Sequence, residues 1–122
     1  MKKLIPALAT IGAIAVVATG TTLAAPAAGP ALKVTAVAAG LKFSPSSLKA
    51  KAGKVTITLK NVSPLPHDLV VQAGDKVLAR TPILAKGKIA SLSVTLKAGT
   101  YGFICSVPGH AAAGMKGSLV VS

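Results

Sequence analysis

Two stretches of this chain alternate between apolar and polar side chains. The first covers residues 54–60, Lys-Val-Thr-Ile-Thr-Leu-Lys, and the second covers residues 88–96. A period of two is typical of a β-strand with one face in a core and the other in water. Further short strands are expected at residues 32–38, 67–72, 76–80, 99–105 and 117–121. No convincing helical period follows residue 31, so we expect an all-β fold.

Turn-forming residues separate the expected strands. Seven or eight short strands at roughly 8–12 residue spacing are typical of a β-sandwich or a barrel. Residues 32–122 are enough for one domain with a modest core. The turns are expected at Ser44-Pro45, Ala52-Gly53, Ser63-Pro64, Gly74-Asp75, Lys86-Gly87 and Ala98-Gly99.

Residues 1–24 have the pattern of a secretory signal peptide. A positive start, Met-Lys-Lys, precedes an apolar run at residues 4–18 and a small-residue cleavage site. The alternative is an uncleaved membrane anchor, because residues 4–25 are nominally long enough to span a bilayer. Residues 25–31, rich in Pro and small residues, are predicted to be a flexible lead-in. We therefore expect export to the periplasm or to the outer face of the cytoplasmic membrane.

The charge balance is strongly basic. Fourteen Lys and Arg residues face two acids, Asp68 and Asp75, which gives a formal net charge of +12. Such a surface attracts acidic partners and anionic membranes. Nucleic acid is not expected, because an exported chain with one Tyr and two Phe has too few aromatic rings for base stacking. Two carboxylates also leave acid–base catalysis almost nothing to work with.

Four residues form a set of soft metal ligands. Cys105, His110 and Met115 lie close together, and His67 is the only other histidine. An unpaired cysteine in an exported chain indicates an intermolecular bridge, a reactive thiol or a metal ligand; a small buried hydrophobe is the alternative. Two histidines and a cysteine in a plane, with a weak axial methionine, are the ligands of a blue copper site. The single Cys, both His and the single Met after the initiator are accounted for by one such site.

The segment Tyr-Gly-Phe-Ile-Cys-Ser-Val-Pro-Gly-His-Ala-Ala-Ala-Gly-Met-Lys-Gly, with Pro-His-Asp upstream, resembles the small blue copper proteins, the cupredoxins of the plastocyanin and azurin type. Its Cys-x4-His-x4-Met loop is similar to that of auracyanin and rusticyanin. The resemblance covers about residues 31–122 and implies a Greek-key β-sandwich with one copper ion, Cu(I) or Cu(II). It implies a one-electron carrier, not an enzyme, with His67, Cys105, His110 and Met115 as the metal ligands.

Two other functions compete with that of an electron carrier. Copper enzymes need further sites built largely from histidine, and both histidines are already used. A zinc site is chemically feasible with Cys and two His, but the placed methionine argues against it. A periplasmic copper-binding or delivery protein would use the same four ligands, and this alternative stays open.

Residues around the ligands carry further expectations from the resemblance. The family usually has Asn after the first His, whereas this chain has Asp68, which we expect to accept hydrogen bonds from Ser106. The alternative is a solvated acid at a strand start. The second loop His reaches the surface in this family, so a small uncharged patch is expected to dock redox proteins with acidic surfaces, of the cytochrome or oxidase type, while the protein stays a monomer. The patch consists of Pro108, Gly109, Ala111 and Ala112.

Overall fold

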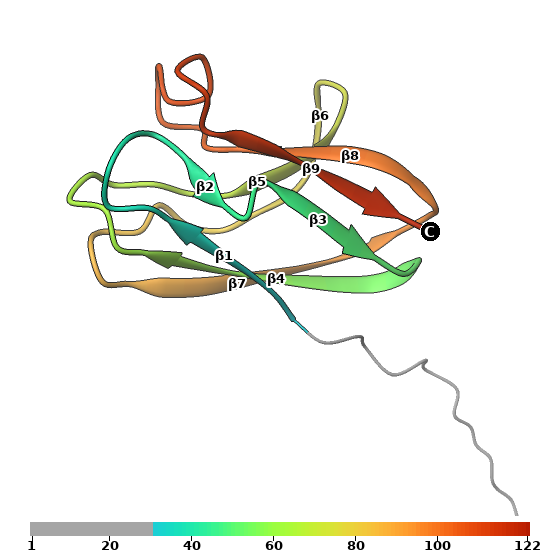
Figure 1. Ribbon diagram of the computed structural model, residues 1–122. Coiled ribbons are helices and arrows are strands. Elements are labelled where there is room, and N and C mark those ends of the chain that lie inside the picture. The colour runs from blue at the N-terminus through green and yellow to red at the C-terminus, as the bar shows by residue number, and fades with distance from the viewer. Residues whose placement is uncertain (1–30) are drawn as a thin grey trace, which may run out of the picture.

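The computed structural model describes residues 31–122, which form two β-sheets packed face to face (Figure 1). The predicted signal peptide, residues 1–24, and all but the last residue of the predicted lead-in lie outside the described residues. The first sheet has the strand order β2-β1-β4-β7, with β1 (Leu32–Ala36), β2 (Phe43–Ser44), β4 (Gly53–Asn61) and β7 (Ile89–Leu96). The second has the order β3-β9-β8-β5-β6, with β3 (Ser47–Ala50), β5 (Val70–Ala73), β6 (Lys76–Arg80), β8 (Gly99–Ile104) and β9 (Lys116–Val121).

The prediction of an all-β sandwich is confirmed. The described part of the chain has nine strands, against the seven or eight expected, and β2 and β3 were not predicted. Two pairings are parallel, β1 with β4 and β3 with β9, and the others are antiparallel. Within residues 31–122 no helix is long and apolar enough to cross a membrane.

The core lies between the sheets and follows the period of two. On β4 the side chains of Val55, Ile57 and Leu59 are buried. The alternate threonines point outward, and the hydroxyl of Thr58 forms a 2.8 Å hydrogen bond with that of Ser91 on β7. Burying one apolar face of each sheet against the other supplies the main driving force for this fold.

Gly117 marks the tightest approach in the second sheet. The Phe103 ring is fully buried, with its centroid 5.5 Å from that of Phe43. A Cβ at Gly117 would lie 2.7 Å from Cε2 of Phe103 and would also overlap the carbonyl oxygen of Ser46. Glycine at the start of β9 therefore lets the strand pack directly on the aromatic core.

The expected strand at residues 67–72 is shorter than predicted, because β5 begins only at Val70. His67 instead makes an isolated β-bridge with Leu84, in which its amide donates to the Leu84 carbonyl at 3.1 Å and its carbonyl accepts from the Leu84 amide at 2.7 Å. The Leu69 amide donates to the Thr81 hydroxyl at 3.0 Å. This local pairing with the segment after β6 holds His67 just outside the sheet.

Candidate metal centre

Three of the four predicted ligands meet at one end of the sandwich. Sγ of Cys105 lies 3.8 Å from Nδ1 of His67 and 3.6 Å from Nδ1 of His110. The two Nδ1 atoms are 3.1 Å apart. His67 and Cys105 are buried, whereas His110 is partly exposed. Residues 38 and 43 positions apart along the chain therefore present one sulfur and two nitrogen atoms to a common point.

The fourth predicted ligand, Met115, is fully buried at the base of the β8–β9 loop. The Cys105 amide donates to the Met115 carbonyl at 3.1 Å, and the Met115 amide donates to the His110 carbonyl at 3.0 Å. These two bonds close the loop directly above the last β8–β9 pair. Gly109 and Gly114 have φ angles of 84° and 114°, a region that favours glycine, and so allow the chain to turn tightly around His110.

Asn61 supports the other side of the site, although the sequence pattern did not by itself indicate this role. Its Nδ2 donates to the carbonyl of Leu65 at 2.9 Å and to that of Leu84 at 2.8 Å, and its Oδ1 accepts from the Ser63 amide at 2.9 Å. One buried side chain thus fixes both the turn before His67 and the residue that pairs with it. The sequence did hold one sign of this role: Asn61 is a polar residue at a position of β4 where the alternation predicts a side chain facing the core.

The ring of His67 is buried with one nitrogen facing the other donor atoms. Its Nε2 is buried and has no hydrogen-bond partner among the described residues. Its Nδ1 faces the other two donor atoms. No hydrogen bond on the far side of the ring therefore competes for the nitrogen that would bind a metal.

Asp68 joins the two ligand-bearing segments. Its carboxylate accepts hydrogen bonds from the Ser106 amide at 2.6 Å and from the Ser106 hydroxyl at 2.5 Å. The Asp68 side chain is 1% exposed, so it is not a solvated acid. A residue next to His67 is thereby tied to the residue next to Cys105, which holds the two ligands in register.

The surroundings of Cys105 and His67 favour the neutral form of each group in the metal-free protein. Burial raises the pKa of the Cys105 thiol, and backbone amides of Asp68 and Val107 partly oppose this shift. Burial also lowers the pKa of His67, and the neighbouring His110 lowers it further. A neutral imidazole keeps its lone pair available for a metal, whereas the thiol must release its proton on binding.

The donor set fits a soft, borderline metal such as copper. Two imidazole nitrogens 3.1 Å apart cannot both carry a proton at the facing positions, and a metal ion between them removes that conflict. A thiolate and two imidazoles are ligands that copper and zinc both accept, and a thioether is selective for copper. The residues present therefore fit the group that the sequence predicted.

The predicted docking residues lie in the turns around His110. Pro108, Gly109 and Ala112 are exposed and Ala111 is partly exposed. Leu65, in the turn before His67, is 48% exposed. The surface around the exposed edge of the site is thus small, apolar and uncharged.

Known proteins resemble this chain in sequence and in fold. The family model for a cupredoxin-like domain matches residues 10–121. Plastocyanin of Scenedesmus fuscus is 36% identical over 98 residues, which cover 74% of this chain and 96% of that protein. Auracyanin B has a TM-score of 0.73 and 28% identity, covering 83% of this chain and 93% of its own. Auracyanin A, described as a "blue" copper protein from the green thermophilic photosynthetic bacterium Chloroflexus aurantiacus, has a TM-score of 0.70 and 26% identity, covering 76% and 98%.

Proposed function

Because this chain belongs to the cupredoxin-like family, we propose that it is an exported type 1 copper protein that carries single electrons between redox partners. The observation that carries the proposal is the convergence of Sγ of Cys105 and Nδ1 of His67 and His110 within 4.8 Å of one another. In this proposal these three residues would hold one copper ion, and Met115 would be a weaker fourth ligand. The bound ion supplies a one-electron couple.

The protein's part in electron transfer is to resist rearrangement. Three ligands lie in a loop closed by backbone hydrogen bonds, and the fourth is paired to Leu84. The bond between Asp68 and Ser106 joins these two segments. Ligands that cannot move between oxidation states keep the reorganisation small, so the same rigidity that fixes the site favours rapid transfer.

The same construction favours copper retention over delivery. Cys105 is 1% exposed and Met115 is fully buried, so an acceptor protein cannot reach the sulfur ligands without opening the loop. His110 alone reaches the surface. Electrons can pass through this edge, and the uncharged patch at Pro108, Ala111 and Ala112 gives a small surface for brief docking.

The proposed location and partners follow from the N-terminal pattern and the charge. The signal-like segment at residues 1–24 directs export, and the net charge of +12 favours redox proteins with acidic surfaces. Two of the plastocyanins similar to this chain are named as chloroplastic proteins. The protein works as a monomer whose electron-transfer edge stays free.

The first test is the absorption spectrum of the purified protein after addition of Cu(II). We expect an intense band on the order of 600 nm that a mild reductant bleaches reversibly. Cys105→Ser should abolish the band, whereas Met115→Leu should keep it, since the thiolate and not the thioether gives the colour. A colourless wild-type protein after refolding with copper would overturn the proposal. Ready transfer of Cu(I) to an apo-acceptor, without reversible redox cycling, would assign delivery instead.

A further inference from the structure

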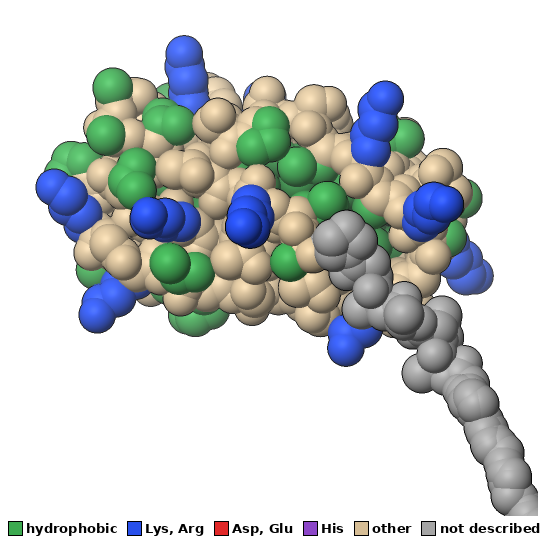
Figure 2. Space-filling view, turned by 60° about the horizontal axis from the view of Figure 1, so that its bottom comes forward, with side chains coloured by type: hydrophobic (Ala, Val, Ile, Leu, Met, Phe, Trp, Pro, Cys, Tyr) green, Lys and Arg blue, Asp and Glu red, His purple; other side chains and the backbone are tan. Residues whose placement is uncertain are grey.

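The outer face of the first sheet is a basic surface. Lys33 on β1 and both Lys54 and Lys60 on β4 are exposed, and Lys88 directly precedes β7. We call the surface with these four lysines the basic face. Figure 2 shows it with scattered blue side chains and no red ones. Lys54 and Lys60 are six residues apart, or about 20 Å along the strand, so the charge is spread and not clustered.

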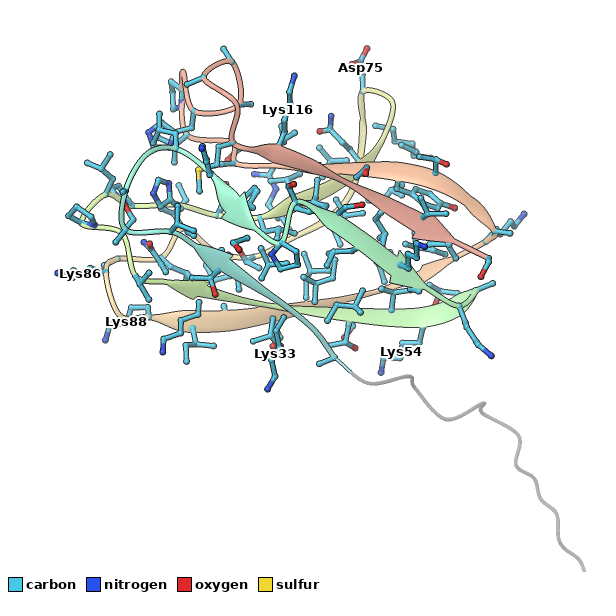
Figure 3. All side chains as sticks on the ribbon, viewed as in Figure 1. Lys33, Lys54, Asp75, Lys86, Lys88 and Lys116 are labelled. Atoms are coloured by element: carbon cyan, nitrogen blue, oxygen red, sulfur yellow. The ribbon has the colours of Figure 1, made fainter. Side chains whose placement is uncertain are left out.

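The basic face has no counter-charge within the part of the chain that the structure describes. Of the two acids, Asp68 is buried beside Ser106. Asp75 is in the turn between β5 and β6, and Figure 3 shows it on the opposite side of the sandwich from Lys33 and Lys54. The lysines of the face therefore attract anions without competition from a neighbouring carboxylate.

The side chains between the lysines are hydroxyls. Thr58 pairs with Ser91 at 2.8 Å, and Thr56 pairs with Ser93 at 2.9 Å. The exposed apolar side chain of this region is Ile89, and the outward positions of β1, β4 and β7 contain neither an arginine nor an aromatic residue. Protein interfaces are enriched in arginine and aromatic residues and depleted in lysine and serine. The composition of the face thus disfavours a protein partner.

A shallow hollow lies in the basic face. It is lined by the side chains of Lys33 and Lys60 together with Thr35, Thr58 and Ile89. Lys33 is cross-strand from Thr58, and Thr35 is cross-strand from Lys60, so the β1–β4 register creates the arrangement.

We propose that the basic face binds the surface of anionic lipid bilayers. A positive charge spread over hydroxyl-bearing strands matches a delocalised anionic surface, and each lysine near such a surface adds to the attraction. The β8–β9 loop, with its partly exposed His110, belongs to the second sheet and to one end of the sandwich (Figure 1). Binding through the first sheet leaves this loop free. Membrane binding of this kind does not require a bound metal.

Vesicle sedimentation with the full-length protein tests the proposal. Vesicles of phosphatidylcholine alone are compared with vesicles that contain phosphatidylglycerol, at low salt and at about 1 M salt, where the Debye length is only about 3 Å. We expect binding to the anionic vesicles at low salt and its loss at high salt. The variant Lys33→Gln, Lys54→Gln, Lys60→Gln should weaken the anionic-over-neutral binding ratio about fivefold per lysine. Every variant keeps the same N-terminal segment, so the ratio isolates the face.

A second variant removes the same charge from the other sheet. It combines Lys49→Gln on β3 with Lys76→Gln and Arg80→Gln on β6. This control should retain most of the binding ratio. Equal losses in both variants would overturn the proposal, because net charge alone would then explain binding. The proposal would also fail if the wild-type protein did not prefer anionic vesicles. It would fail as well if the basic-face variant bound vesicles normally and lost only its binding to a soluble acidic protein. The metal-free protein should give the same ratios, so this test is separate from that of copper binding.

Discussion

Asp68 is the only buried acid among the described residues, and its charge can be removed without removing its shape. In Asp68→Asn, Oδ1 can still accept from the Ser106 amide, and the new amide group can donate to the Ser106 hydroxyl. The site geometry should therefore persist while one negative charge disappears. The charge matters at the sulfur, since the Asp68 carboxylate adds to the effect of burial in raising the pKa of Cys105.

The negative charge of Asp68 should also affect the reduction potential of a bound copper ion. Reduction adds negative charge, which a neighbouring carboxylate disfavours, so Asp68→Asn should raise the reduction potential. A unit charge about 4 to 8 Å away, at an effective dielectric constant of about 20, is worth about 2 to 4 kcal/mol, or about 90 to 170 mV in a one-electron couple. Because Ser106 is exposed, solvent screens part of this interaction. We expect an increase of roughly 50 to 150 mV.

Protein-film voltammetry of the copper-loaded protein measures this shift. The matched control is Asp75→Asn, which changes the net charge equally but lies in the exposed β5–β6 turn (Figure 3). Its potential should stay within about 10 mV of the wild type, because exposed distant charges are screened. An unchanged potential in Asp68→Asn, with the blue band intact, would refute the reasoning. Equal shifts in both variants would refute it too, since position would then be irrelevant.

Three further predictions concern stability. Gly117→Ala should cost about 1 to 3 kcal/mol, because its Cβ overlaps the Phe103 ring, and should lower the Tm by about 4 to 8 °C per kcal/mol. Gly102→Ala, whose Cβ meets nothing nearer than 3.9 Å, should be nearly neutral in the same thermal melts, and equal losses would contradict the packing argument. In urea titrations the metal-free protein should lose stability as the pH falls below 6.5, because the lowered pKa of His67 makes the unfolded chain bind more protons. Its stability should also fall as the pH rises through 9.0, because the raised pKa of Cys105 keeps the folded thiol protonated; a flat profile from pH 5 to 10 would contradict both assignments. Removal of bound copper by a chelator should lower the free energy of unfolding by about 4 kcal/mol, if the free metal had been at about 1,000 times its Kd. An unchanged calorimetric Tm would show that the metal does not bind the folded state preferentially.

The ligand set could be predicted from the sequence because its residue types are scarce. With a single Cys and two His, the chain offers few alternative assignments, and the strands that carry them follow a clear period of two. The contact between Asp68 and Ser106 could also be anticipated, since both residues directly follow predicted ligands. Both features could be predicted because they depend on the number of possible ligands in the chain or on residues that are neighbours in sequence.

What could not be predicted depends on pairing between distant segments. Strand β3 contributes one buried leucine, Leu48, and is too short to show a period. The His67 bridge to Leu84 replaces a strand that local pattern favoured, because the partner segment lies beyond β6. Asn61 fixes this arrangement through hydrogen bonds to two separate loops. Side-chain alternation alone does not indicate which carbonyls a buried amide will meet.

The position of β9 sets the order in which the molecule can be assembled. This last strand of the described region lies between β8 and β3, and β3 has no other neighbour in its sheet. Strand β3, formed from residues 47–50, therefore waits unpaired until residues 116–121 are available. Such long-range pairing slows folding and leaves the chain open late in synthesis. The second sheet is therefore completed only when residues 116–121 pair with both β3 and β8.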